Sequence, residues 1–291
     1  MSKFIYNVHA RGMMVAVIVF MLSCFLPSIL QAQVTYERQD SLTVCRLLQK
    51  SHRQTDVLTL ARHFLGVPYV AHTLEVNGEE RLVVNTRQLD CTTLVETVSA
   101  LKLCAEQGKR SWNDYLEALR QLRYRGGKLE GYASRLHYFT DWIRDKVHMR
   151  LVDDIQQPNP PFTAVQQVSV SYMSKHPDAY KALKAHPELV PVIARQEQSL
   201  TGLKVRYIPK SAVRNTTLMR QTVKDGDILA ITCTKAGLDI AHLGFAVWRA
   251  DGLHLLNASQ LRHKVVEEPM TLRRYLSKHP TFTGIRVVRL K

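Results

Sequence analysis

The type of secondary structure that the sequence predicts changes once along the chain, and this change constrains the fold more than any other feature. Before Gly202 the apolar residues recur mainly at helical spacing, whereas after it short β-branched runs alternate with turn dipeptides such as Asp225-Gly226 and Asp251-Gly252. Strands and helices do not alternate as they do in parallel βαβ folds. The sequence therefore predicts an α+β fold, in which helices pack on an antiparallel sheet.

Three segments follow from this change. We expect N-terminal helices over residues 33–109, a large helical insertion over 110–202, and the sheet over 203–291. The expected strands of the sheet are 205–208, 228–232, 240–248, 253–258, 264–267 and 284–290, with a helix at 272–276. Prolines 158, 160 and 161 interrupt the insertion. In the first segment, a helix over 58–65 should end at Gly66, and Asn77-Gly78 predicts a β-hairpin.

The N-terminus has the features of an export signal. Lys3 and Arg11 precede an apolar run over residues 13–30, and a small residue, Ala32, follows it. Pro27 interrupts the run, which disfavours a retained membrane anchor because a spanning helix needs about 20 unbroken apolar residues. We therefore expect a signal peptide over 1–32 and a periplasmic protein. A lipoprotein anchored through Cys24 is the alternative.

The chain is strongly basic, with 40 Lys and Arg against 25 Asp and Glu, and loss of residues 1–32 would still leave a net charge of +13. Such a charge favours acidic partners but does not identify them. No nucleic-acid-binding motif accompanies it, so nucleic acid is not an expected partner.

The five cysteines predict no zinc site, because their spacings match no zinc pattern. We expect Cys45, Cys104 and Cys233 to be small buried side chains or to form one incidental disulfide. Cys91 differs, because Leu94, Val95, Val98 and Leu101 follow it at the spacing of a buried helix.

Cys91 is the candidate nucleophile, since it would lie in the first turn of this helix with Asp90 at the N-cap. Unpaired N–H groups there favour a thiolate and can bind an oxyanion. A cysteine hydrolase also needs a histidine base and a polar group that orients it. His242 opens a strand whose alternation places Gly244 and Ala246 on the same face and should leave room for substrate. If the chain turns at Asp251-Gly252, Asn257 is diagonal to His242 on that face.

These residues lie in motifs that resemble a known family. The motifs are GVPY at 66–69, LDCTTLV at 89–95, DGDI at 225–228, HLG at 242–244 and LNAS at 256–259. Together they resemble the NlpC-type papain-like hydrolases of bacterial cell walls. The segment YRGGKLEGYASRLHYFTDW, residues 124–142, is similar to a marker of a subgroup of N-acetylmuramoyl-L-alanine amidases first catalogued as a domain of unknown function. The third catalytic position is usually His in this family, whereas Asn257 stands here.

The resemblance implies a papain-like core and a metal-independent, cofactor-free reaction. Cys91 would attack the lactyl amide between N-acetylmuramic acid and L-Ala, with His242 as base and Asn257 orienting its ring. Tyr69 and Asp90 would be polar contacts in the cleft. Arg135, Tyr138 and Trp142, at positions i, i+3 and i+7, could form one face of a helix in the insertion and hold the sugar.

Three functions fit these features. The first is an amidase acting on peptidoglycan or muropeptide fragments, with intact wall and released anhydro-muropeptides both open as substrates. The second keeps the nucleophile but cuts the stem peptide as a γ-D-glutamyl endopeptidase. The third is a non-catalytic wall-binding protein that uses its basic surface.

Overall fold

The computed structural model describes residues 34–291, so the expected signal peptide and Cys24 lie outside the described residues. Its helices are α2 (Arg38–Lys50), α3 (Val57–Arg62), α4 (Cys91–Glu106), α5 (Trp112–Arg123), α6 (Phe139–His148), α7 (Tyr172–Lys175), α8 (Lys181–Ala185), α9 (Val190–Leu200), α10 (Thr217–Thr222) and α11 (Leu272–Ser277). Among these residues, none of the helices has the length and apolar character needed to cross a membrane.

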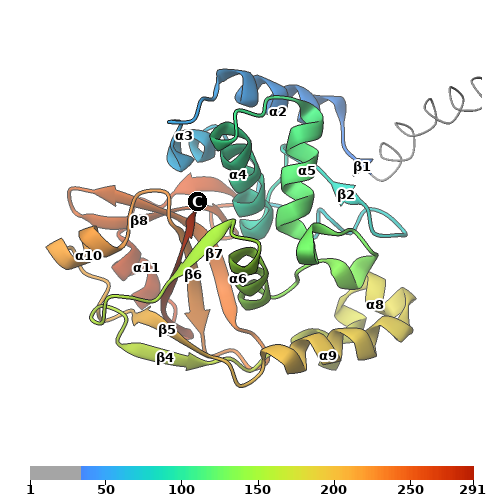
Figure 1. The fold of residues 1–291 in the computed structure, drawn as a ribbon. Coiled ribbons are helices and arrows are strands. Elements are labelled where there is room, and N and C mark those ends of the chain that lie inside the picture. The colour runs from blue at the N-terminus through green and yellow to red at the C-terminus, as the bar shows by residue number, and fades with distance from the viewer. Residues whose placement is uncertain (1–33) are drawn as a thin grey trace, which may run out of the picture.

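One antiparallel sheet organises the molecule (Figure 1). Its strands are β3 (Val152–Ile155), β4 (Ala164–Gln167), β5 (Lys204–Pro209), β6 (Ile228–Cys233), β7 (Ile240–Arg249), β8 (Gly252–Ser259), β9 (Lys264–Glu267) and β10 (Phe282–Leu290). The order is β4-β5-β10-β6-β7-β8-β9, and β3 also pairs with β10. The six strands expected after Gly202 are thus all present, and the α+β prediction is confirmed.

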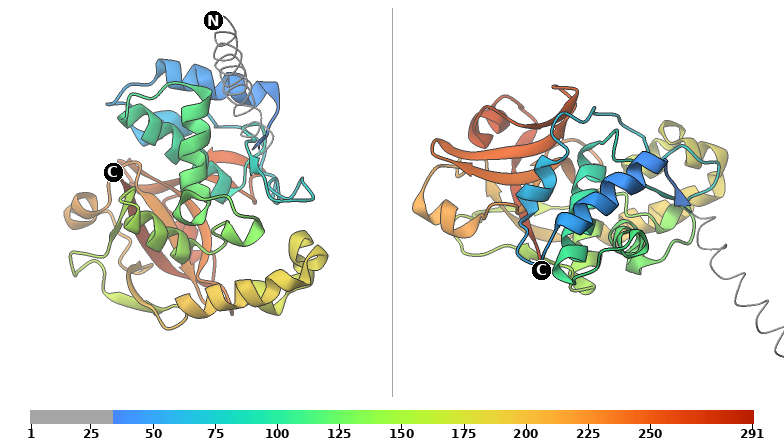
Figure 2. Two further views of the ribbon diagram at one scale, coloured as in Figure 1. Left: turned by 45° about the vertical axis from the view of Figure 1, so that its right-hand side comes forward. Right: turned by 90° about the horizontal axis from the view of Figure 1, so that it is seen from above.

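Helices cover both faces of the sheet. Leu94, Val95 and Val98 of α4 are fully buried in one cluster with Phe245 and other core-facing residues of β7 and β8. Helices α10 and α11 contribute to a second cluster with side chains from the opposite face. Figure 2 shows α8 and α9 at one edge of the molecule, away from α10. The helix that begins at Cys91 therefore packs on the sheet, as predicted.

The middle segment is not purely helical, which corrects the expectation of a helical insertion over 110–202. It contains β3 and β4, and both strands join the large sheet. Helices α5 and α6 belong to the main core, while α7, α8 and α9 form a third cluster around Tyr138. Each of the two strands is only four residues long, too short for period-two alternation to be recognised in the sequence.

The β-hairpin predicted at Asn77-Gly78 is also absent, since residues 73–80 form a turn, a bend and irregular chain with no strand. The strand after them, β2 (Leu82–Val83), pairs in parallel with β1 (Val34–Thr35) instead of folding back on its neighbour. The Asn77 side chain accepts a hydrogen bond from the Thr35 hydroxyl at 3.1 Å. Long-range contacts with the N-terminal strand thus replace the local hairpin. Helix α3 ends near the predicted position, and Gly66 has a positive φ of 85°.

Candidate active site

Helix α4 begins at Cys91, and Asp90 is its N-cap as predicted. The Asp90 carboxylate accepts a hydrogen bond from the backbone N–H of Thr93 at 2.7 Å, and the Thr93 hydroxyl accepts one in return from the N–H of Asp90 at 2.9 Å. This capping box fixes the first turn of the helix. The backbone N–H of Cys91 lies in that turn, where it has no intrahelical partner.

Cys91 and His242 line the same cavity, which has a volume of about 210 Å³. The cavity is open on one side to solvent and is bounded by the start of α4, the chain before α6 and the start of β7. Its polar lining includes Cys91, Thr92, His137, Tyr138, Asp239 and His242. The nucleophile and base predicted from the sequence are therefore brought together, although 150 residues separate them in the chain.

Asn257 holds the ring of His242. Nε2 of His242 is 2.9 Å from Oδ1 of Asn257, which is fully buried. In the β7–β8 ladder Phe245 pairs with Leu256, so Asn257 is diagonal to His242, as the register argument predicted. Because an amide oxygen only accepts, Nε2 carries the hydrogen and Nδ1 keeps its lone pair. Within residues 34–291, Nδ1 of His242 makes no hydrogen bond.

Gly244 does not provide the space for substrate that the sequence suggested. A Cβ atom at this position would lie 2.6 Å from the carbonyl oxygen of Leu256 and 2.8 Å from the Leu255 side chain. The Leu255 side chain already fills the space above Gly244. Because Gly244 has no side chain, β7 and β8 can lie close together. The open volume lies instead at the beginning of β7, beside His242.

The resting thiol differs from the expectation of a thiolate. Burial, and after it the negative charge of Asp90, raise the pKa of Cys91 to about 12. Hydrogen bonds from the backbone of Leu243 and from Thr92 act in the opposite direction but are weaker. Burial also lowers the pKa of His242, against the opposing effect of its bond to Asn257. Both shifts favour the neutral forms, a thiol and an imidazole, in the cavity that the two residues line.

Tyr69 lies near Cys91 and Asp90, but neither Tyr69 nor Asp90 is among the residues that line the cavity. Burial, followed by the negative charges that Cys91 carries when ionised and that Asp90 carries, raises the pKa of Tyr69 to about 12. Its backbone N–H donates to the carbonyl of His263 at 3.0 Å, which ties this loop to the chain before β9. The Tyr69 hydroxyl therefore stays protonated at neutral pH and can donate a hydrogen bond.

Arg135, Tyr138 and Trp142 do not form one helical face. Residues 132–134 form a 3₁₀ turn, Arg135 has an extended backbone, and α6 begins only at Phe139. Trp142 is 1% exposed and stacks on Phe139 with ring centroids 4.8 Å apart. It therefore belongs to the core, and the prediction that it contacts a sugar is not supported.

Arg135 and Tyr138 have different surroundings. The buried Arg135 guanidinium lies 4.8 Å above the ring of Tyr132 and pairs with Glu75 and, at 3.7 Å, with Glu80. Its charge is thus neutralised inside the protein. Tyr138 lines the cavity, but its hydroxyl donates to Glu197 at 2.6 Å.

Two polar residues of the cavity were missed in the sequence, His137 and Asp239. His137 lies within the 124–142 motif and directly precedes Tyr138, so its place in that motif could have indicated it. Asp239 is buried and accepts a hydrogen bond from the N–H of Thr140 at 2.7 Å, near the start of α6. No local pattern predicts this contact, because 99 residues separate the two partners.

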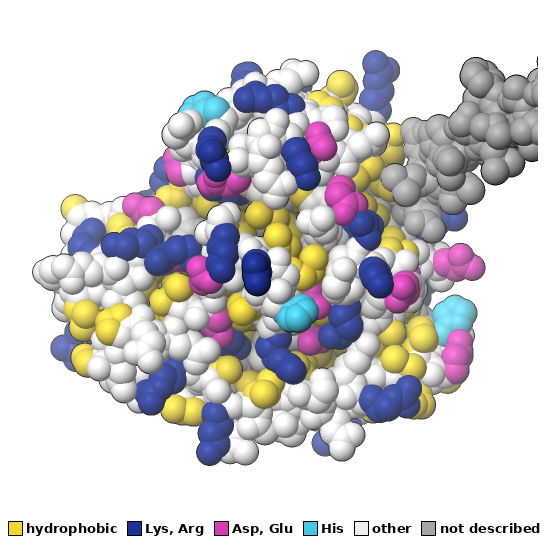
Figure 3. Space-filling model, in the orientation of Figure 1, with side chains coloured by type: hydrophobic (Ala, Val, Ile, Leu, Met, Phe, Trp, Pro, Cys, Tyr) yellow, Lys and Arg dark blue, Asp and Glu magenta, His cyan; other side chains and the backbone are white. Residues whose placement is uncertain are grey.

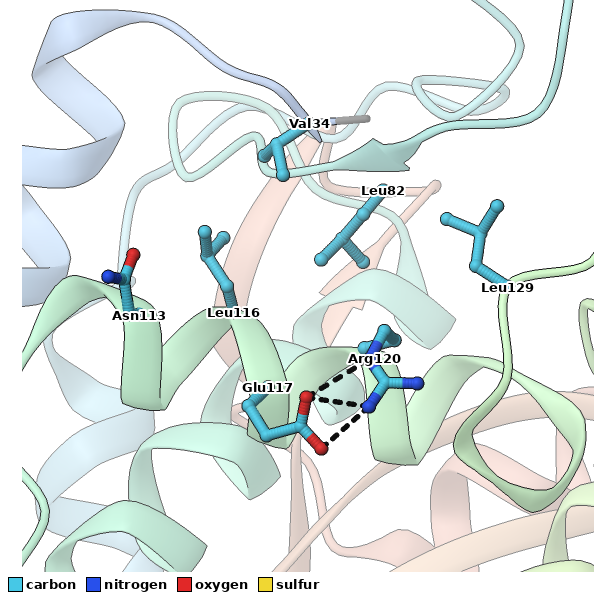
Figure 4. A pocket seen from close by; sticks show the side chains of 7 residues that line it. All are labelled: Val34, Leu82, Asn113, Leu116, Glu117, Arg120 and Leu129. Carbon is cyan, nitrogen blue, oxygen red and sulfur yellow. Dashed lines mark hydrogen bonds and ion pairs between the residues drawn. The ribbon is translucent and has the colours of Figure 1, made fainter. Parts of the chain in front are cut away.

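Other cavities of the molecule do not contain Cys91 or His242, although some of them are larger, such as the one of about 840 Å³ beside Arg144 and Asp153. A smaller cavity of about 150 Å³ lies between β2 and α5, where Glu117 and Arg120 pair with each other beside apolar side chains (Figure 4). Cys45, Cys91, Cys104 and Cys233 are all free in the described part of the chain, and no disulfide joins them. Lys and Arg side chains are scattered among other types over the face shown in Figure 3, without forming one continuous stripe.

Comparison with known proteins shows the family of this chain. Residues 59–285 match the AmiA-like family model, described as N-acetylmuramoyl-L-alanine amidase-like. A crystal structure of an N-acetylmuramoyl-L-alanine amidase from Bacteroides uniformis is 42% identical, with a TM-score of 0.76, over 81% of this chain and 98% of that one. A putative xylanase from Bacteroides fragilis is 40% identical, with a TM-score of 0.74, over 80% of this chain and all of the other.

A more distant Legionella pneumophila protein shares the fold, with 22% identity and a TM-score of 0.67 over 87% of this chain and 94% of that one. No curated protein matches the chain. The family match covers more than half of the sequence and includes Cys91, His242 and Asn257. The chain therefore belongs to the N-acetylmuramoyl-L-alanine amidase-like family.

Proposed function

We propose that the protein is a cysteine-dependent amidase of peptidoglycan fragments, which cleaves the amide between the lactyl group of N-acetylmuramic acid and L-Ala. One observation carries the proposal: Cys91 and His242 line one cavity, and a buried Asn257 orients the histidine at 2.9 Å. This is the arrangement that cysteine hydrolysis requires. The match to a family described as N-acetylmuramoyl-L-alanine amidase-like supports this choice of bond.

The first step transfers the Cys91 proton to Nδ1 of His242 while the sulfur attacks the lactyl carbonyl carbon. Because thiol and imidazole are both neutral at rest, His242 acts as a general base during attack. The Nε2–H bond to Asn257 then stabilises the imidazolium that forms. The electron pair of the C=O bond moves to oxygen, where the backbone N–H of Cys91 and the Tyr69 hydroxyl would donate hydrogen bonds.

Collapse of the tetrahedral intermediate breaks the C–N bond. His242 returns its proton to the nitrogen of L-Ala, and the stem peptide leaves with a free amine. The lactyl group remains on Cys91 as a thioester. Water then attacks this thioester with His242 again as base, which releases the sugar with a lactyl carboxylate and restores the thiol.

The same arrangement supports the wider assignment to the NlpC-type papain-like hydrolases. A nucleophile at the start of a helix, a histidine at the start of a strand and an amide on the next strand occur here in that chain order. The metal-independent reaction is part of the proposal, because every step above uses only side chains and backbone of this chain. Export to the periplasm, through the signal predicted at residues 1–32, would bring the protein to its substrate.

The experiment offers the protein two substrates, a muropeptide with its N-acetylmuramic acid and the same stem peptide without sugar, and identifies the products by mass. From the first substrate we expect N-acetylmuramic acid with a free lactyl carboxylate and an intact stem peptide. We expect no cleavage of the second substrate. A folded Cys91→Ala protein should be inactive, and His242→Ala should lose activity by a similar factor. Cleavage of the sugar-free peptide at equal rate would make the protein an endopeptidase instead. Full activity of the Cys91→Ala protein would show that Cys91 is not the nucleophile.

A further inference from the structure

A second histidine, His137, lines the cavity that contains Cys91 and His242. Its Nε2 lies 3.1 Å from the backbone carbonyl of Tyr132, and its ring packs on the Tyr132 ring with centroids 4.5 Å apart. A carbonyl oxygen can only accept, so Nε2 carries the hydrogen. The tautomer and the orientation of the ring are therefore both fixed.

The other nitrogen, Nδ1, keeps its lone pair. It forms no hydrogen bond to any residue within 34–291. Burial, together with the nearby Arg135 guanidinium, lowers the pKa of His137 to about 3, so the ring is neutral at every pH at which the enzyme would work. A neutral imidazole held in this way offers a permanent hydrogen-bond acceptor.

Two neighbouring polar groups of this wall already have hydrogen-bond partners. The Tyr138 hydroxyl donates to Glu197 and accepts from the N–H of Met173 at 3.0 Å. One carboxylate oxygen of Asp239 accepts from the N–H of Thr140. Among the described residues, no lysine or arginine lines the cavity. The wall therefore favours a group that donates hydrogen bonds and does not favour an anion.

We infer that His137 is a specificity-determining residue, whose Nδ1 accepts a hydrogen bond from a secondary amide N–H of the substrate. The inference rests on the proposed function, because the substrate would carry such groups next to the cut bond. One source is the acetamido group of the sugar, and the other is the amide between L-Ala and the following residue. His137 is not the base, since its Nε2–H is held by a carbonyl and its protonated form is disfavoured.

Two variants separate the acceptor from the structural bond to Tyr132. In His137→Gln, the side-chain amide can still donate to the Tyr132 carbonyl but leaves no acceptor at the position of Nδ1. In His137→Asn, an amide oxygen can occupy that position, while the Tyr132 bond is lost. We expect His137→Gln to melt near the wild-type temperature yet lose about 3- to 10-fold in kcat/KM, the range for one neutral hydrogen bond. His137→Asn should melt lower but retain more of the kcat/KM.

Substrate analogues identify the donor. A muropeptide with a 2-deoxy sugar lacks the acetamido N–H, and one that is N-methylated at the amide after L-Ala lacks the peptide N–H. The analogue that lacks the true partner should be cleaved equally well by wild type and His137→Gln, whereas the other should keep the full difference. If both analogues keep the full difference, or if His137→Gln matches wild type on the complete substrate, the inference is wrong.

Binding measurements keep this test independent of catalysis. Calorimetry with Cys91→Ala and with Cys91→Ala/His137→Gln measures affinity for the muropeptide without turnover. We expect the second protein to bind about 3- to 10-fold more weakly. Equal affinity of the two proteins would overturn the role of His137. Failure of the proposed function would appear differently, as binding by Cys91→Ala with no cleavage by wild type.

Discussion

At the scale of single residues, the proton on Cys91 has to move to His242 as the sulfur attacks. A helix start alone favours a thiolate, but here burial and the adjacent Asp90 carboxylate outweigh that effect. His242 is likewise held neutral. The proton would therefore pass from Cys91 to His242 only during attack on the substrate, and the two residues would not form an ion pair beforehand.

Labelling of Cys91 by iodoacetamide should report this state. Only the thiolate reacts, so a pKa of about 12 predicts slow labelling at pH 7 that rises nearly tenfold per pH unit and still rises at pH 10. A free cysteine peptide, with a pKa of about 8.5, should level off earlier. Peptide mass mapping can follow Cys91 separately from the other cysteines. A plateau below pH 7 would demonstrate a preformed thiolate and contradict this description.

The variant Asp90→Asn tests whether the charge of Asp90 contributes to the raised pKa of Cys91. Asn is as good an N-cap as Asp, so the helix should keep its first turn and its stability. Loss of the negative charge should lower the pKa of Cys91 and speed its labelling at pH 8. An unchanged labelling rate in a folded Asp90→Asn protein would show that Asp90 acts only as a cap.

Asn257 provides the second test at this scale. Its Oδ1 accepts from Nε2 of His242 inside the protein, so Asn257→Leu should leave the ring unheld and reduce kcat/KM about 10- to 100-fold. Asn257→His keeps a nitrogen that can accept and should lose less. Steady-state kinetics of the two folded variants would show the order. Equal activity of Asn257→Leu and wild type would move the orienting role to another residue.

Single-residue predictions succeeded where the signal was local. The cap at Asp90, the helix after Cys91 and the diagonal position of Asn257 follow from spacing within one element or one hairpin. The prediction that Arg135, Tyr138 and Trp142 form one sugar-binding helical face was wrong because residues 132–138 are not α-helical. No local propensity indicated this. His137 was missed since its role depends on a cavity formed by distant segments.

At the scale of elements, the β7–β8 pair positions His242 and Asn257 and depends on Gly244. A Cβ at Gly244 would lie 2.6 Å from a backbone oxygen of β8, so Gly244→Ala must push the strands apart. We expect a loss of about 1 to 3 kcal/mol in the free energy of unfolding and a lower kcat/KM in the protein that remains folded.

Gly78→Ala is the control for this prediction, because nothing lies within 4 Å of a Cβ at that position. Thermal melts and kinetics of both variants measure the difference. If Gly244→Ala were as stable and as active as Gly78→Ala, close approach of β7 and β8 would not matter for the site.

Elements were predictable from the sequence where turns and alternation coincided. All six strands after Gly202 have turn residues or a pattern break at their ends, and their bounds were predicted to within about two residues. Strands β3 and β4 have no such signal. They form because β3 pairs with β10 and β4 pairs with β5. Helix α10 was not predicted, although α11, which is equally short, was.

At the scale of the whole molecule, β3 joins the middle segment to the C-terminal strand. Arg286 of β10 is 1% exposed and donates to Asp154 of β3 and to the Thr140 hydroxyl, each at 2.9 Å. Asp154→Ala would leave this guanidinium buried without its counter-charge. Such a loss typically costs about 3–5 kcal/mol. We expect the whole chain to unfold at lower temperature in one transition.

The adjacent Asp153 is the control, because its pair with Lys291 is exposed on both sides. Asp153→Ala should change the free energy of unfolding by no more than about 1 kcal/mol. Calorimetry of the two variants tests the difference. A small effect of Asp154→Ala, or separate melting of the middle segment, would show that this segment is not integral to the sheet.

The central claim concerns both the nucleophile and the bond, and one measurement tests the two together. Protein mixed with a muropeptide is quenched in acid during turnover, and its intact mass and peptide map are recorded. We predict an adduct on the peptide that contains Cys91, with the mass of the N-acetylmuramoyl group and no amino acid from the stem, and no adduct on Cys91→Ala. An adduct that includes L-Ala and D-Glu, or one that forms at another residue, would contradict the account.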